Sequence, residues 1–203
     1  MHTSRDYLAR SIADKIKAER LRLKQSFEAS ESEVGVRYCI IDNLLSEKLA
    51  LQISSAFPPT SSMREMSSFR EKKFTSKNLQ AFNPILTEIT FAIQDEQVIQ
   101  EVEEVTGINA QLPDPSLYAG GISTMTKGHF LRPHIDNSHD QSRLLYRTLN
   151  LLYYVSFGWK AKNGGNLELW DPTVHRRTVI NSEFNRLVIM ETNPTSWHSV
   201  SKV

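Results

Sequence analysis

The sequence predicts an α+β fold in which helices come first and a run of antiparallel strands follows. Helical spacing of apolar residues dominates the N-terminal half of the chain, up to about residue 116. From Leu117 onward, short β-rich segments alternate with Gly, Pro, Asn and Asp turn signals. Consecutive strands joined by short turns pair as antiparallel neighbours. The C-terminal part therefore predicts a jelly-roll-like sandwich that helices support on one side.

Residues 4–28 predict a long amphipathic helix, because apolar residues recur there at helical spacing and charged residues fill the intervals. The recurring apolar residues are Leu8, Ile12, Ile16, Leu23 and Phe27. The acidic and small residues at 28–33 favour a solvated connection. Residues 36–41 are β-rich and predict the first strand.

Three further helices and a loop are expected before the strands begin. Ser46 can cap a helix over 46–57, which Pro58 and Pro59 would end. The polar segment 60–76 has no regular period and predicts a mobile loop. A helix is expected over 77–94, bent or divided by Pro84. Asp95 can cap the next helix, which Gly107 would end.

The strands of the C-terminal part are separated by turn dipeptides such as Gly164-Gly165, Asp171-Pro172 and Asn193-Pro194. The expected strands are 117–126, 146–157, 166–170, 176–180 and 186–191. We expect one domain over 1–203, because no internal repeat or linker divides the chain. Its parts are an N-terminal helix and connection (1–33), a helical support with the first strand (34–116) and a jelly-roll core (117–203).

Composition excludes some classes of function. The chain has 24 Lys and Arg against 23 Asp and Glu, a net charge of +1, which argues against nucleic acid as a partner. No apolar run approaches the ~18–20 residues that cross a bilayer, so no membrane partner is expected. The single Cys39 cannot form an intrachain disulfide, and no secretory signal is evident. These features favour a cytoplasmic protein, and they leave its oligomeric state open.

The residues that carry chemistry are His134 and Asp136, with His198 further along the chain. At the strand period of two, residues 134 and 136 project to the same side, so an imidazole and a carboxylate converge. Two imidazoles and one carboxylate on one face of a metal leave open positions opposite, as oxygen-activating non-haem Fe(II) requires. Zinc accepts the same ligands. Hydrogen-bonded histidines without a metal are the other interpretation that the spacing leaves open.

Five sequence blocks resemble the 2-oxoglutarate and Fe(II)-dependent oxygenases of the prolyl 4-hydroxylase type, in that family's order. They are Gly128–Asp136, Leu149–Val155, Gly164–Asp171, Asn185–Glu191 and Ser196–His198. A sixth segment, Arg37–Leu45, is similar to the first strand of that fold more weakly. The resemblance implies a double-stranded β-helix, the cupin-like jelly roll.

The resemblance also implies an activity and a site. The activity is hydroxylation of an unactivated C–H of a prolyl, amino-acid or small-molecule substrate, with release of succinate and CO2. The implied cofactors are Fe(II), 2-oxoglutarate as cosubstrate, O2 and ascorbate as a reductant. His134, Asp136 and His198 match the iron ligands, and no separate catalytic base is implied. Tyr154 matches a tyrosine that binds the distal carboxylate of 2-oxoglutarate, and Asn150 is expected to line the same pocket.

One departure from the family keeps other interpretations open. An Arg or Lys that pairs with the 2-oxoglutarate carboxylate is expected on the strand after the second histidine, and Lys202 does not match its position. We expect this cation on a last strand that residues 117–203 lack; a substitute basic group elsewhere, or impaired cosubstrate binding, is the alternative. The alternatives are a non-catalytic metal-binding jelly roll and a small zinc hydrolase. The other histidines, His129, His139 and His175, are expected to be exposed loop residues.

Overall fold

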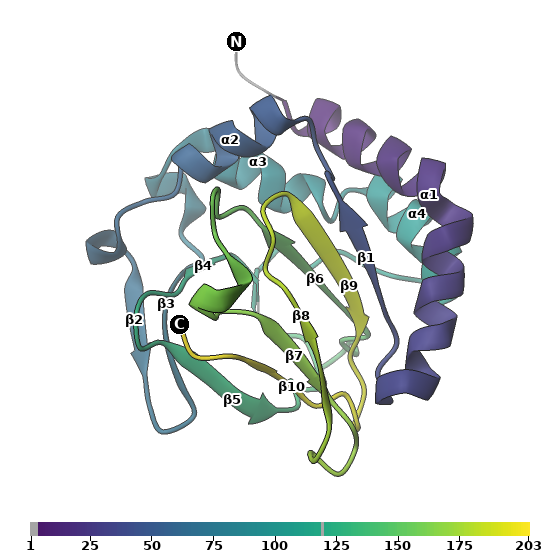
Figure 1. The fold of residues 1–203 in the computed structure, drawn as a ribbon. Helices are drawn as coiled ribbons and strands as arrows, with labels where there is room; N and C mark the ends of the chain where they lie inside the picture. The colour runs from purple at the N-terminus through teal and green to yellow at the C-terminus, as the bar shows by residue number, and fades with distance from the viewer. Residues whose placement is uncertain (1–3, 119) are drawn as a thin grey trace.

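The strands form two sheets that face each other (Figure 1). The computed structural model describes residues 4–118 and 120–203. The smaller sheet has the antiparallel order β1 (Tyr38–Asp42), β9 (Arg186–Glu191), β6 (Leu149–Tyr154). The larger sheet runs β2 (Arg64–Ser67), β3 (Glu71–Ser76), β5 (Phe130–His134), β10 (His198–Val200), β7 (Leu167–Trp170), β8 (Arg177–Ile180), and β4 (Ile122–Thr124) pairs with β3.

Helices cover the outer face of the smaller sheet. They are α1 (Arg5–Val34), α2 (Glu47–Ser55), α3 (Pro84–Ala92) and α4 (Glu96–Thr106), with short 3-10 turns η1 (Thr60–Ser62), η2 (Leu79–Ala81) and η3 (Ala161–Asn163). The apolar stripe of α1 packs with α3, α4 and the outward side chains of β1 and β9 in one hydrophobic core. Within the described residues, no helix is both long enough and apolar enough to cross a membrane.

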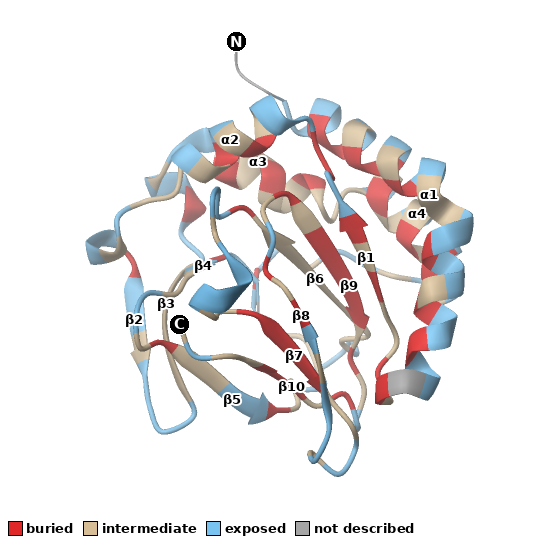
Figure 2. Ribbon diagram, viewed as in Figure 1, coloured by how far each residue is buried: buried red, intermediate tan, exposed pale blue. Residues whose placement is uncertain are grey.

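Strand β9 lies between two cores, and Figure 2 shows that its middle residues are buried. Leu187 and Ile189 belong to the core under the helices, whereas Val188 and Met190 belong to the core between the two sheets. All four side chains are fully buried, because both faces of the strand are covered. The predicted order of helices followed by antiparallel strands, closed as a helix-supported jelly roll, is confirmed.

Strand β6 lies at the edge of the smaller sheet and divides its side chains between the same two cores. Leu149, Leu151 and Tyr153 pack on the helix side, and Leu152 and Tyr154 pack between the sheets. Within the part of the chain that the structure describes, β6 pairs only with β9. Its other edge is therefore open.

The first helix is longer than its periodicity predicts, and the prediction of a solvated connection at 28–33 is wrong. Helix α1 continues to Val34 and ends at Gly35, whose φ of 75° is left-handed. Ser30 is buried in the last turns, where its hydroxyl donates to the Phe27 carbonyl and accepts from the backbone N–H of Tyr38. The helix therefore persists because its last turns pack on the chain that leads into β1.

The prediction of a mobile loop over 60–76 is also wrong, because this segment contains the β2–β3 hairpin. Both strands carry charged residues on each face, so the alternation that marks a half-buried strand is missing from the sequence. Strand β3 exists because it pairs with β4 and β5, which lie far along the chain. Strands β5 and β10, which the turn signals did not predict, are likewise defined by their partners in the sheet.

The boundaries of α3 and α4 follow local sequence signals more closely than the end of α1 or the β2–β3 hairpin does. Pro84 does not divide a helix: it is the first residue of α3, and Asn83 accepts a hydrogen bond from the Ile85 N–H as the N-cap. Asp95 caps α4 through the Gln97 N–H, and Gly107 ends it with a φ of 69°. Both ends of α4 are therefore as predicted.

Replacing Gly107 by alanine is expected to lower the free energy of unfolding by about 1 kcal/mol, because alanine disfavours the left-handed backbone at this position. A Cβ at Gly107 would meet nothing within 4 Å, so only the backbone conformation contributes. Gly107→Asn is expected to lower the free energy of unfolding by less, since asparagine tolerates this conformation. Urea unfolding measures both. Equal values for the two variants would contradict the explanation.

Candidate metal centre

The larger sheet brings His134 and His198 together. His134 is the last residue of β5 and His198 the first of β10, and the two are direct partners in the antiparallel register. Their ring centroids lie 4.2 Å apart. Asp136 follows β5 by two residues, and one ligand atom from each of the three side chains lies within 4.8 Å of the other two. The structure thus places all three predicted metal ligands at one point.

Both imidazoles are oriented by backbone carbonyls. His134 Nδ1 lies 2.9 Å from the Arg132 carbonyl oxygen, and His198 Nδ1 lies 3.0 Å from the Ser196 carbonyl oxygen. A carbonyl only accepts hydrogen bonds, so each Nδ1 carries the hydrogen and each Nε2 keeps its lone pair. The Nε2 atoms of His134 and His198 lie 3.6 and 3.7 Å from the Asp136 carboxylate oxygens.

The charges of the cluster suit a cation. Burial raises the pKa of Asp136, but the neighbouring His134 ring and the charges of His198 and Arg147 outweigh it and hold the pKa at about 2. Burial, together with repulsion from His134, lowers the pKa of His198. At neutral pH the site therefore offers an ionised carboxylate and a neutral His198 imidazole, the protonation states that metal binding requires.

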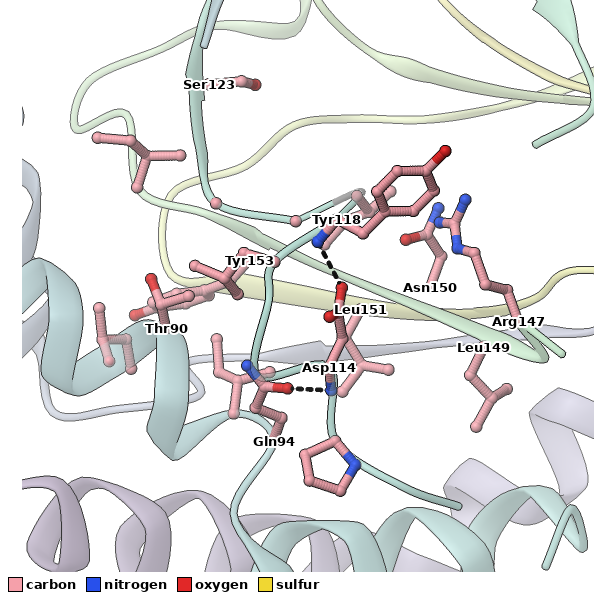
Figure 3. Close-up of a pocket in the computed structure, with 18 of the residues that line it drawn as sticks. Thr90, Gln94, Asp114, Tyr118, Ser123, Arg147, Leu149, Asn150, Leu151 and Tyr153 are labelled. Atoms are coloured by element: carbon pink, nitrogen blue, oxygen red, sulfur yellow. Dashed lines mark hydrogen bonds between the residues drawn. The ribbon is translucent and has the colours of Figure 1, made fainter. Parts of the chain in front are cut away.

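Asp136 is itself held by two donors. The Asn150 amide donates to Asp136 Oδ2 at 2.9 Å, and the Arg147 guanidinium donates to the same oxygen at 3.3 Å. In Figure 3, Arg147 and Asn150 project in the same direction. Asn150 was predicted to line the cosubstrate pocket. It does line the large cavity described below, but its donor nitrogen is directed at Asp136. Nothing in the spacing of the sequence pointed to Arg147.

The donor set fits a divalent transition metal. Two Nε2 atoms and one carboxylate make a facial triad that leaves the opposite positions free, the arrangement of non-haem Fe(II) oxygenases. Partners that orient each ligand through its other atoms are also a property of such sites. Zinc takes the same donors, so ligand chemistry alone does not choose between the two metals.

A cavity of about 1390 Å³ is lined in part by Asn150 and Arg147, the two donors to Asp136, whereas His134, Asp136 and His198 are not among its lining residues; Figure 3 shows part of the lining. Strands β4 and β6 both contribute walls. Tyr154 lines it from the inner face of β6, and burial raises the pKa of its phenol. Within the described residues, the Tyr154 hydroxyl has no hydrogen-bond partner, whereas Tyr153 on the opposite face donates to Asn185 at 2.8 Å. The charge of Arg186 also acts on the Tyr154 phenol and opposes the effect of burial on its pKa.

The remaining histidines differ in their surroundings. The prediction that His129 is exposed is wrong: it is 4% exposed, tilted against Phe74 at 5.1 Å, with Nε2 3.3 Å from the Thr126 hydroxyl. His139 is partly buried beside Tyr146, at a ring distance of 4.4 Å. His175 is exposed, as expected. Within the described chain, none of the three joins the cluster around Asp136.

Comparison with known proteins decides between the metals. Residues 120–203, which contain the whole cluster, match the family model of the 2OG-Fe(II) oxygenase superfamily. The chain carries a 2OG-Fe(II) oxygenase domain. The predicted resemblance is confirmed, and so are Fe(II), 2-oxoglutarate and O2 as the cofactors of this 2-oxoglutarate-dependent dioxygenase. Ascorbate stays a prediction.

Solved structures of prolyl hydroxylases share the fold. The Pseudomonas putida prolyl-4-hydroxylase has a TM-score of 0.56 and 14% identity, over 89% of this chain and 91% of its own. The Trichoplax adhaerens prolyl hydroxylase, in complex with a hypoxia inducible factor peptide fragment, has a TM-score of 0.56 and 18% identity, over 91% and 85%. A Phytophthora capsici prolyl 4-hydroxylase has a TM-score of 0.54 and 16% identity, over 100% of this chain and 62% of its own. No curated protein matches the chain by sequence.

Proposed function

We propose that this oxygenase hydroxylates an unactivated C–H of a prolyl, amino-acid or small-molecule substrate and releases succinate and CO2. His134, Asp136 and His198 hold the iron. The observation that carries the proposal is the convergence of two carbonyl-oriented imidazoles and one doubly held carboxylate beside a large cavity. A peptidyl substrate is supported by the relative from Trichoplax adhaerens, which was solved with a peptide.

Each residue has a defined task in this proposal. When bound, Fe(II) would activate O2, which then oxidises both 2-oxoglutarate and the substrate. The Arg132 and Ser196 carbonyls keep the two Nε2 atoms pointed at the metal. Asn150 keeps Asp136 oriented through Oδ2. The apolar inner face of β6, including Leu152, limits the access of water.

The distal carboxylate of 2-oxoglutarate requires polar partners. We infer that the Tyr154 hydroxyl is one of them, because it lines the cavity without a partner of its own. Arg147 is the one basic side chain among the described residues that line the cavity, and it is engaged with Asp136. We infer that a second basic group contributes: the charge of Arg186 acts on the Tyr154 phenol, although Arg186 also forms ion pairs with Asp42 and Glu183.

Anaerobic titration of the ferrous protein with 2-oxoglutarate tests these assignments. An optical absorption band is expected to grow as 2-oxoglutarate chelates the metal. Tyr154→Phe is expected to raise the dissociation constant for 2-oxoglutarate about tenfold through the loss of one hydrogen bond to a charged group. Affinity for Fe(II) should not change.

Tyr7→Phe is the control, because it removes a hydroxyl from a side chain that is 55% exposed on α1 and is not among the residues that line the cavity. Its dissociation constant for 2-oxoglutarate should equal that of the parent. Equal affinities of the parent and Tyr154→Phe would refute the role of Tyr154.

A further inference from the structure

Arg147 joins the two ends of one loop at the candidate metal centre. The loop covers residues 137–146, between Asp136 and the approach to β6, and is called the 137–146 loop below. Arg147 Nη1 donates to the Asn137 side-chain oxygen at 2.8 Å, while Nη2 donates to Asp136 Oδ2. Its backbone N–H donates to the Ser138 carbonyl at 3.0 Å. One residue thus binds the first two residues of the loop and the carboxylate before it.

The loop is ordered internally around Asp140. The Asp140 carboxylate accepts hydrogen bonds from the backbone N–H groups of Ser142, Leu144 and Leu145. Its own N–H donates to the Leu145 carbonyl. A bridge between His139 and Tyr146 closes the base of the loop. The hydrogen bonds of Asp140 and the bridge at the base therefore hold the loop in one conformation.

The 137–146 loop is also a wall of the cavity. Several of its residues line the cavity, namely Asp140, Gln141, Ser142, Leu145 and Tyr146. Leu144 is 82% exposed and Tyr146 74% exposed, so the loop presents apolar side chains to solvent beside the site. By contrast, the Arg147 side chain is 16% exposed and the Asp136 side chain 18%. The position of the loop thus shapes the cavity, and its only charged link to the cluster among the described contacts is Arg147.

We propose that Arg147 is a positioning residue that couples the 137–146 loop to the Asp136 carboxylate. The orientation of Asp136 that suits a metal ion and the observed position of the loop then stabilise each other. This proposal rests on the proposed function, since it takes Asp136 as a metal ligand. Such coupling is reciprocal: metal binding must order the loop, and loss of the link must weaken metal binding. The planar guanidinium fork spans both partners at once, which an ammonium group cannot do.

Co(II) titration of the full chain, followed by optical absorption, tests the effect on the metal. Arg147→Ala is expected to raise the Co(II) dissociation constant about 10- to 100-fold, the usual effect of removing a partner of a metal ligand. Arg147→Lys should lie between this variant and the parent. Arg143→Ala removes a charge from the same loop, and its side chain has no hydrogen bond or ion pair in the described structure. It should bind Co(II) like the parent.

Hydrogen exchange of the loop amides tests the coupling itself. Co(II) should slow exchange over residues 137–146 in the parent and in Arg143→Ala, and this protection should be lost in Arg147→Ala. Unchanged Co(II) affinity, or unchanged protection, in Arg147→Ala would overturn the proposal. If Arg147→Lys has the Co(II) affinity and the loop protection of the parent, the planar guanidinium is not required. Failure of the proposed function is recognised separately, because His134→Ala would then still bind Co(II) like the parent.

Discussion

Replacement of His134 by alanine is expected to reduce succinate formation from 2-oxoglutarate to background, a loss of more than about 100-fold. Even the partners of metal ligands contribute 10- to 100-fold to metal affinity or activity, and a ligand contributes more. His134 Nε2 is one of only three donors in the cluster. Among the described residues, no other metal-binding side chain belongs to the cluster and could replace it. The measurement is succinate release with Fe(II) and O2, together with the mass of the hydroxylated product from a proline-containing peptide and from free proline.

His175→Ala is the control, because His175 is exposed and lies outside the cluster. It should keep the activity of the parent. Far-ultraviolet circular dichroism should show that His134→Ala is folded, since the His134 side chain is held by a single hydrogen bond to a backbone carbonyl. Equal turnover by His134→Ala and the parent would exclude the site.

Asn185→Ala is expected to lower the free energy of unfolding by about 3 kcal/mol, the largest effect on stability that we predict. Asn185 is 2% exposed and has a φ of 62°, a conformation that asparagine tolerates better than alanine. Its amide nitrogen donates to the Leu45 carbonyl at 2.7 Å, and its amide oxygen accepts from the Leu45 N–H and the Tyr153 hydroxyl. Alanine would leave these buried groups without partners.

Urea unfolding measures this change. Tyr153→Phe removes one of the three hydrogen bonds and should lower the free energy of unfolding by about 1 kcal/mol. Asn163→Ala, at an exposed position in η3, should change it by less than about 0.5 kcal/mol. If Asn185→Ala lowers the free energy of unfolding by less than about 1 kcal/mol, water must satisfy the groups that the amide leaves. Because the Asn185 N–H also donates to the Tyr154 carbonyl, this residue fixes the end of β6 that carries Tyr154.

Local patterns predicted much of the molecule because their causes lie within a few residues. The caps of α4 at Asp95 and Gly107 follow from side-chain and backbone preferences at single positions. Strand β9 has the predicted bounds, Arg186–Glu191. A short, continuous apolar run is typical of a strand that is buried on both faces. The assignment of His134, Asp136 and His198 as ligands came from their residue types and from the family resemblance, and it stays a prediction until metal binding is measured.

The features that sequence reasoning missed depend on partners far along the chain. The β2–β3 hairpin has no apolar alternation of its own and exists through β4 and β5. His129 is buried because Phe74 of β3 lies against it. The residue type of Asn150 does not tell which acceptor its amide nitrogen will contact. The hydrogen bond from Asn150 to Asp136 was therefore not predictable.

By itself, then, the sequence determined that helices precede most of the antiparallel strands, and it predicted which residues form the cluster, because residue type and short-range spacing carry this information. Tertiary structure alone decided how the cluster is built. The register of β5 against β10 sets His134 beside His198. The return of the chain after the 137–146 loop sets Arg147 against Asp136. Both contacts arise from packing between distant segments, which no local pattern records.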